Sequence, residues 1–125
     1  MSRTNEERAL NTDEARVMDH LLSLDFPGAS ELRLQQAHAR VVGRCQCGCA
    51  TVDLAVDASF APPARDVPSP IPAEAEVIGD GDQVVGSVIV FPNDGYLSGL
   101  EIYSFGEPIR AWPAAASLRP YLRVA

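Results

Sequence analysis

The sequence contains no lysine: its ten basic residues are all arginine, against 17 acidic residues, and the formal net charge is −7 at pH 7. Excess negative charge repels phosphate backbones, so we expect no nucleic-acid partner. The patterns G-x-x-x-x-G-K-[ST], G-x-G-x-x-G and G-x-S-x-G are also missing, which argues against phosphoryl transfer, a dinucleotide site and a hydrolase nucleophile elbow. We therefore expect a noncatalytic protein rather than an enzyme.

Long apolar segments are missing as well. No run approaches the roughly 18 apolar residues of a membrane-spanning helix, and the first residues, MSRTNEER, lack the apolar core of a secretion signal. The three cysteines lie within five residues, too close for a disulfide framework, which fits a reducing compartment. These features predict a cytoplasmic protein with no membrane partner.

Length and composition indicate one folded domain. The chain has 125 residues, of which 46% are hydrophobic and 22% charged, close to the average of globular proteins. Residues 1–10 have hardly an apolar anchor, and we interpret them as a flexible N-terminal tail. The domain is then expected to span residues 11–125.

The first part of this domain is predicted to be helical. Asn11 or Thr12 can cap a helix over residues 13–24, which carries apolar residues at helical spacing and ends before Pro27. A second, shorter helix is predicted over residues 29–37. On it we expect Leu32 to face inward.

The two glutamines of this second helix, Gln35 and Gln36, are expected to face largely outward. After the helix the period of the apolar residues changes. Val41 and Val42 begin a β-rich stretch, and residues 52–56 alternate apolar and polar side chains. These two strands are predicted to form a hairpin.

The rest of the chain predicts more antiparallel strands. Five prolines place residues 59–73 in a long loop, and residues 74–78 are interpreted as an edge strand. Residues 84–91 form a nearly continuous apolar run, typical of a central strand covered on both faces. They should pair with residues 96–105 across a hairpin turn at 92–95.

After this hairpin, the alanine-rich segment 114–118 is predicted to form a short helix or turn that stops near Pro120. Helices followed by antiparallel strands define the fold class. The sequence therefore predicts an α+β fold, with two N-terminal helices packed on a mainly antiparallel β-sheet in a two-layer sandwich.

The most specific motif is Cys45-Gln46-Cys47-Gly48-Cys49. Soft thiolates suit zinc, and His38 would complete a Cys3His ligand set. In a regular strand the three α-carbons would lie about 7 Å apart, too far for the sulfurs to converge unless Gly48 bends the chain. No C-x-x-C pair is present.

Three interpretations of the cysteines therefore remain: structural thiols, a zinc site, and a redox or nucleophilic role. Buried cysteines often behave as small hydrophobic residues, which favours the first. A nucleophilic role would need a base near one thiol, and the sequence places none there. We expect no cofactor, and we keep zinc at Cys45, Cys47, Cys49 and His38 as the alternative.

A candidate surface for a protein partner lies on the strand at residues 96–105. Glu101, Tyr103 and Phe105 share one face of this strand, and aromatic residues beside a charge are common at interfaces. A carboxylate on the solvent face of an antiparallel sheet is also ordinary. The function expected from the sequence is that of a small partner-binding or regulatory protein, with a structural zinc module or a small enzyme as alternatives.

Four segments together resemble a family of small, mainly actinobacterial proteins of unknown function. They are Phe26-Pro27-Gly28, Glu31-Leu32-Arg33, Cys45-x-Cys47-Gly48-Cys49 leading into Val52-Asp53, and Gly95-Tyr96-Leu97-x-x-Leu100-Glu101-Ile102-Tyr103-Ser104. The resemblance covers about residues 20–110, and it implies no catalytic residue, cofactor or substrate. The last segment is also similar to strands of small bacterial immunity and antitoxin-like proteins, which implies binding to a partner.

Overall fold

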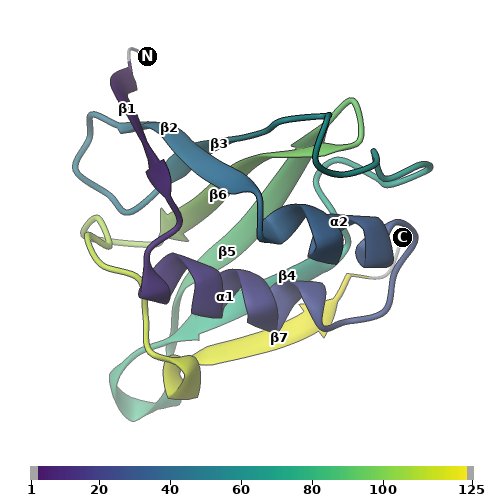
Figure 1. Ribbon diagram of the computed structural model, residues 1–125. Helices are drawn as coiled ribbons and strands as arrows, with labels where there is room; N and C mark the ends of the chain where they lie inside the picture. Colours follow the sequence, from purple (N-terminus) through teal and green to yellow (C-terminus); the bar gives the residue numbers. More distant parts are fainter. Residues whose placement is uncertain (1–2, 124–125) are drawn as a thin grey trace.

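The computed structural model describes residues 3–123, which contain two α-helices and seven β-strands (Figure 1). In chain order these elements are β1 (Arg3–Ala9), α1 (Thr12–Leu22), α2 (Ala29–Gln36), β2 (Ala39–Cys45), β3 (Val52–Val56), β4 (Ala73–Ile78), β5 (Val84–Asn93), β6 (Tyr96–Ser104) and β7 (Leu118–Leu122). Short 3-10 turns lie at Asp80–Asp82 and Ala115–Ser117. Both predicted helices are confirmed, with ends that differ by at most two residues.

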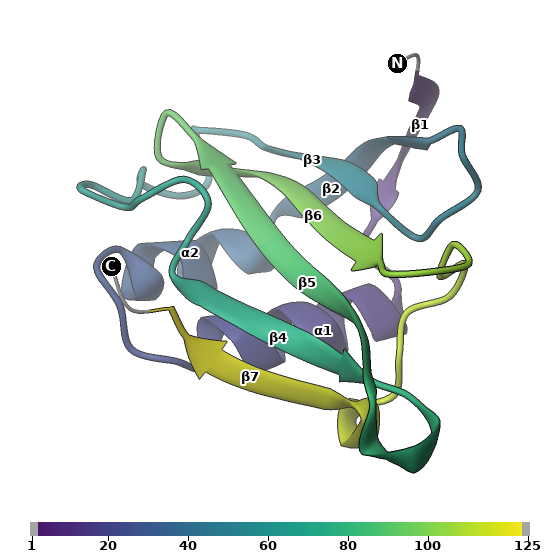
Figure 2. The same ribbon diagram turned by 180° about the vertical axis from the view of Figure 1, so that it is seen from behind.

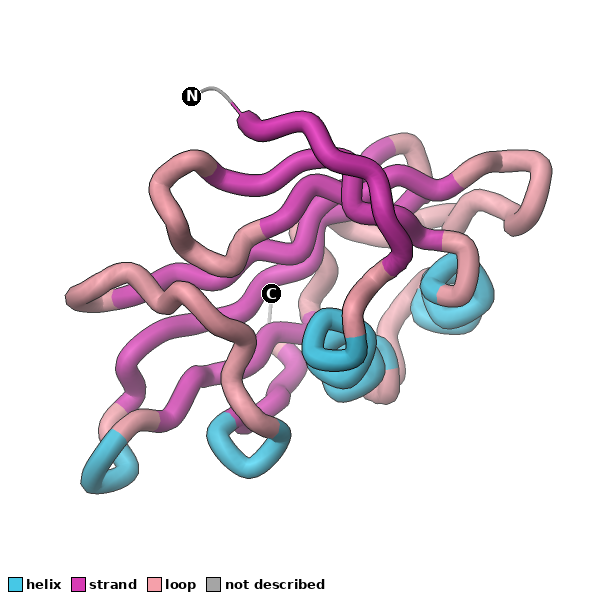
Figure 3. Tube along the Cα trace, turned by 60° about the vertical axis from the view of Figure 1, so that its left-hand side comes forward, coloured by secondary structure: helices cyan, strands magenta, loops and turns pink. Residues whose placement is uncertain are grey.

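The seven strands form one sheet in the order β1-β2-β3-β6-β5-β4-β7, and all neighbouring pairs run antiparallel. Both helices lie on one face of this sheet (Figure 1). Seen from behind, the other face has no helix over it (Figure 2). A third view shows the helices gathered on one side of the strands (Figure 3). The α+β class and the two-layer arrangement are confirmed.

The hydrophobic core fills the space between the helices and the sheet. Its fully buried side chains include Val17, Met18, Leu21 and Leu22 of α1, Leu32 of α2, and Val41, Val88, Val90, Leu97 and Leu100 of the sheet. Each such side chain stabilises the fold by about 1.5–3 kcal/mol relative to an exposed position. The core therefore holds the domain together without any contribution from the cysteines beyond Cys45.

Helix α1 begins with a complete capping box. The backbone N–H of Glu14 donates to Asn11 Oδ1 at 2.8 Å, and the backbone N–H of Asn11 donates to Glu14 Oε1 at 3.0 Å. Such a cap contributes about 1 kcal/mol. It fixes the point at which the chain passes from the first strand into the helix layer.

The hairpin between β5 and β6 turns at Asp94 and Gly95, which have φ values of 52° and 82°. Asn, Asp and Gly tolerate such positive φ angles, and a two-residue hairpin turn requires them. An added Cβ at Gly95 would also lie 2.8 Å from the carbonyl oxygen of Ala64, in the proline-rich loop. The predicted hairpin at residues 92–95 is confirmed.

The described part of the predicted flexible tail forms strand β1 instead. Arg3–Ala9 pairs antiparallel with β2, with Thr4 opposite Arg44 and Arg8 opposite Val41. Backbone hydrogen bonds make this pairing, so the strand needs no apolar pattern that a sequence could show. Residues 1 and 2, also assigned to the tail, lie outside the described residues.

Two strands are correctly predicted, but their position or burial in the sheet is not: residues 74–78 were expected at an edge, and residues 84–91 were expected to be covered on both faces. The segment at residues 74–78 is not at the sheet edge, because β4 lies between β5 and β7. Strand β7 follows the short turn at Ala115–Ser117, and Pro120 is tolerated in it because it is the edge strand. Strand β5 is central as predicted, but only its alternate residues are buried, and Ile89 lies half-buried on the helix-free face.

Gln35 was also expected to face outward and is instead completely buried. Its Nε2 donates to the carbonyl oxygens of Pro62 at 2.9 Å and Gly95 at 2.8 Å. Its Oε1 accepts from the backbone N–H of Leu97 at 2.9 Å. One amide thus satisfies three backbone groups and ties α2 to the proline-rich loop and to the β5–β6 hairpin.

Candidate metal centre

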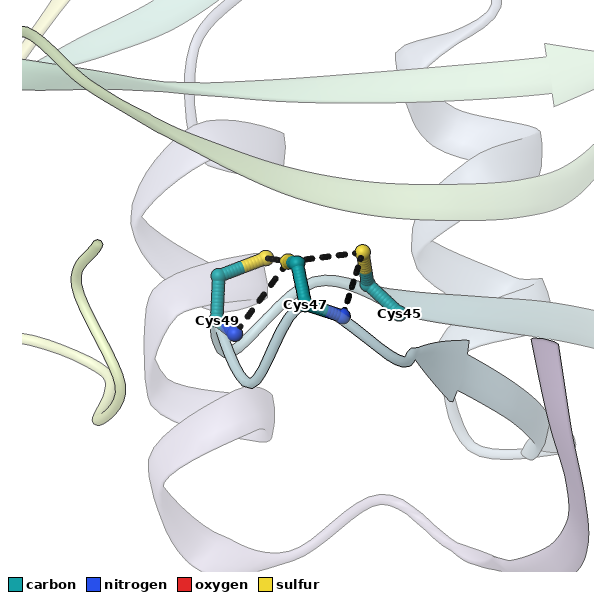
Figure 4. A group of neighbouring side chains, drawn as sticks. All are labelled: Cys45, Cys47 and Cys49. Carbon is teal, nitrogen blue, oxygen red and sulfur yellow. Dashed lines mark hydrogen bonds between the residues drawn. The ribbon is translucent and has the colours of Figure 1, made fainter. Parts of the chain in front are cut away.

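The three cysteines converge in the loop between β2 and β3. Cys45 is the last residue of β2 and is buried, Cys47 is exposed, and Cys49 is intermediate. The Sγ atoms of Cys45 and Cys47 lie 2.7 Å apart, and those of Cys47 and Cys49 lie 3.0 Å apart. All three sulfurs lie within 4.8 Å of one another (Figure 4). None of the three is in a disulfide bond, and we call this group of thiols the thiol cluster.

The backbone of the loop explains why the thiols converge. Gly48 has φ of +90°, so the chain turns sharply between Cys47 and Cys49 instead of continuing as a strand. The backbone N–H groups of Cys47 and Cys49 each donate to the preceding cysteine sulfur at 3.4 Å. The sequence predicted that the sulfur atoms could converge only if Gly48 bends the chain, and the structure has this bend.

The cluster has dimensions that suit one metal ion. Tetrahedral zinc with bonds of about 2.3 Å places its sulfur ligands about 3.8 Å apart. The two closest sulfur pairs are 2.7 and 3.0 Å apart. Side-chain shifts of about 1 Å therefore bring three thiolates to three corners of a zinc tetrahedron.

His38 does not belong to this cluster, which corrects the predicted Cys3His ligand set. It lies just before β2, whereas Cys45 ends that strand, and seven residues at about 3.3 Å each separate them by roughly 20 Å. The His38 ring stacks on Phe60, with centroids 5.4 Å apart. Among the described side chains, no His, Asp or Glu joins the three cysteines.

A Gly48→Ala variant should lose much of the arrangement of the thiol cluster. Alanine at φ of +90° is strained by about 1–2 kcal/mol, and its Cβ would displace the guanidinium at the flexible end of the Arg110 side chain. We expect a lower melting temperature together with weakened metal binding, measured by thermal unfolding and zinc titration. Gly81→Ala is a matched control, because Gly81 also has positive φ but nothing lies within 4 Å of an added Cβ. A Gly48→Ala protein that binds zinc as the unaltered chain does would contradict this role.

A polar pocket adjoins the cluster, between the loop, the start of α1 and the segment after β6. In its wall the Glu14 carboxylate is 2% exposed and accepts from both Nη atoms of Arg8, at 2.7 and 2.9 Å. Burial alone would raise the pKa of Glu14. The hydrogen bonds from Arg8 and Asn11, with the charge of Arg8, outweigh burial and hold the pKa below its ordinary value.

This lowered pKa makes stability depend on pH. Ionised Glu14 stabilises the fold above its ordinary pKa of 4.5, and this stabilisation is lost as the pH falls through the lower folded-state pKa. We expect Glu14→Gln to cost about 2 kcal/mol at pH 7, because a charged hydrogen-bond pair is lost, and progressively less below pH 4.5. Urea unfolding at several pH values measures the difference.

The control for this experiment is Asp13→Asn, which removes a neighbouring carboxylate that pairs with Arg16 at the surface. Such an exposed pair contributes about 0.5 kcal/mol or less. A Glu14→Gln cost that stays constant from pH 7 to pH 3 would show that the Arg8–Glu14 pair is not its origin.

The residues predicted for a partner surface lie on the helix-free face of the sheet. Glu101 is half-buried and pairs with Ile89 of β5, whereas Tyr103 is 45% and Phe105 69% exposed. Desolvation, followed by the charge of Glu101 and a hydrogen bond to it, raises the pKa of Tyr103. Tyr103 and Phe105 are therefore surface residues and not part of the core.

Comparison with known proteins leaves the site to be interpreted from its own geometry. No family model, curated protein or solved structure matches this chain. Neither helix of the described residues has the length and apolar character needed to cross a membrane.

Proposed function

We propose that this protein binds one zinc ion through the thiolates of Cys45, Cys47 and Cys49. The observation that carries the proposal is the convergence of three reduced cysteine thiols, whose sulfur atoms lie within 4.8 Å of one another. Soft thiolates select soft or borderline ions, and zinc has no geometric preference that the loop would have to satisfy. This reverses the expectation of no cofactor, which rested on the missing C-x-x-C pair and on His38 as the one candidate for a fourth ligand.

The site differs from a closed structural zinc site. Structural sites use four protein ligands, whereas three ligands and an open position characterise sites that exchange a ligand. Cys47 and Cys49 also lie outside the cluster of buried apolar residues that forms the hydrophobic core of the described chain. We therefore infer that zinc stabilises the folded chain by ligand linkage and that the chain stays folded after the metal is removed.

The direct test is metal content. Protein purified with a phosphine reductant should hold about one zinc per chain after dialysis against metal-free buffer, measured by elemental analysis. Cobalt substitution should give thiolate-to-metal absorption, and zinc should protect the three thiols from alkylation. A chain that holds no metal after zinc loading, and whose thiols react equally fast with and without zinc, would refute the proposal.

Protein binding through Glu101, Tyr103 and Phe105 remains the second candidate. Two exposed aromatic side chains on a sheet face without helices favour it. We expect Phe105→Ala to change the unfolding free energy by no more than about 0.5 kcal/mol, because the ring is 69% exposed. Chemical unfolding measures this, and Ile102→Ala, at a buried position three residues earlier, should cost about 3 kcal/mol as the matched control. A large loss in Phe105→Ala would place the ring in the core.

A further inference from the structure

The pocket beside the thiol cluster has a volume of about 740 Å³, and Cys45, Cys49, Glu14, Arg110 and Trp112 are among its lining residues. This size is typical of small-molecule sites. Because two of the three cysteines line it, a ligand in the pocket can reach a metal ion held by the cluster. The proposed zinc would have an open fourth position, since no fourth His, Asp or Glu joins the thiols among the described side chains.

Some charged side chains in the pocket wall form ion pairs within the described residues, and one does not. Glu14 is bound by both Nη atoms of Arg8, and Asp13 lies 2.7 Å from Nη2 of Arg16. Both carboxylates are thus matched by their own arginines. Arg110 forms no ion pair with any residue of the described chain, so it is a cation able to take an anionic group.

Arg110 is held next to the cluster by the backbone. The N–H of Ala50 donates to the carbonyl oxygen of Ile109 at 3.0 Å, which fastens the segment after β6 to the cysteine loop. The Arg110 guanidinium then lies over Gly48, in the space that a Cβ would occupy. A planar guanidinium in this place can bind a carboxylate through two hydrogen bonds.

We propose that the pocket binds a small thiol that carries a carboxylate. This inference rests on the proposed zinc site. The ligand sulfur, soft like the three cysteine thiolates, fills the fourth metal position, and its carboxylate pairs with Arg110. On binding, the metal–water bond breaks and a metal–sulfur bond forms, while the thiol proton passes to solvent. No electron is transferred.

The experiment compares three probes on the cobalt-loaded chain, with a phosphine as the reductant. Mercaptoacetate has both groups, 2-mercaptoethanol lacks the carboxylate, and acetate lacks the thiol. Dissociation constants are taken from the change in thiolate-to-cobalt absorption. We expect mercaptoacetate to bind about tenfold more tightly than 2-mercaptoethanol, which is the typical effect of one guanidinium–carboxylate pair, and acetate to add no sulfur absorption.

Arg110→Gln should abolish the preference for mercaptoacetate over 2-mercaptoethanol and leave cobalt binding intact. Arg65→Gln is the matched control, because it removes the same charge from an exposed position in the proline-rich loop. Equal preference in the unaltered chain and in Arg110→Gln would overturn the inference. So would extraction of the metal by mercaptoacetate without a ternary complex. A chain that binds no cobalt or zinc would instead refute the metal site itself, so the two failures are distinguishable.

Discussion

A Cys47→Ala variant should bind zinc about 100- to 1000-fold more weakly than the unaltered chain. Thiolate zinc sites gain on the order of 10 kcal/mol of binding free energy, so one of three thiolates contributes about 3 kcal/mol. Cys47 is the exposed member of the cluster, and its removal leaves the core untouched. Competition with a chromophoric chelator measures the affinity.

Gln46→Ala is the control for this variant, because it alters the same loop and keeps all three thiols. It should bind zinc with nearly the affinity of the unaltered chain. The metal-free forms of both variants should unfold at similar temperatures, which separates metal binding from folding. If Cys47→Ala keeps its zinc affinity, Cys47 is not a ligand and the three-thiolate site is wrong.

The second large effect is expected at Gln35. Gln35→Ala removes three hydrogen bonds and leaves the carbonyl oxygen of Pro62 and the N–H of Leu97 without this partner, while the carbonyl oxygen of Gly95 keeps the hydrogen bond from the N–H of Ala64. Because each unsatisfied buried group costs about 1–3 kcal/mol, we expect a loss of about 3–5 kcal/mol in unfolding free energy. Urea unfolding measures it, and a loss of this size is a large part of the stability of a small domain.

Two further variants identify the cause of that loss. Gln35→Glu keeps the size of the side chain but places an acceptor against two carbonyl oxygens, so it should be at least as destabilising as the alanine. Gln36→Ala, next along the helix, removes a half-buried side chain bonded to Ala15 and Asp19 and should cost only about 1 kcal/mol. Similar losses in Gln35→Ala and Gln36→Ala would show that the three contacts of Gln35 carry no special stabilisation.

Elements that form through interactions between residues close in the sequence could be predicted from local sequence patterns. The Asn11 cap and the apolar spacing behind it predicted α1, and the sequence at residues 92–95 predicted the hairpin turn. Strand β1 could not be predicted in this way, since its pairing uses backbone groups of β2. Gln35 was misplaced because its three partners come from segments more than 25 residues further along the chain.

The candidate site was only partly predictable for a similar reason. The cysteine spacing identified the three thiols, but their convergence depends on the φ angle of Gly48, which spacing does not reveal. Arg110 reaches the loop through the pairing of β3 with β6, about 60 residues after the cysteines. A weak sequence signal lay in Pro108 and Pro113, which indicate that the segment around Arg110 forms neither a helix nor a strand. Such a segment can pack against the cysteine loop.

The contact between β3 and β6 is short: two residue pairs join these strands, Val52 with Leu100 and Asp53 with Gly99, whereas eight join β5 and β6. This seam divides the sheet into two halves, each contiguous in sequence, with residues 3–56 on one side and 73–122 on the other. Helix α1 packs on β4 and α2 packs on β6, so the helices of the first half contact strands of the second half. Under mechanical load the helix layer and the hydrogen bond from Ala50 to Ile109 would resist separation of the two halves together with the short contact between the strands.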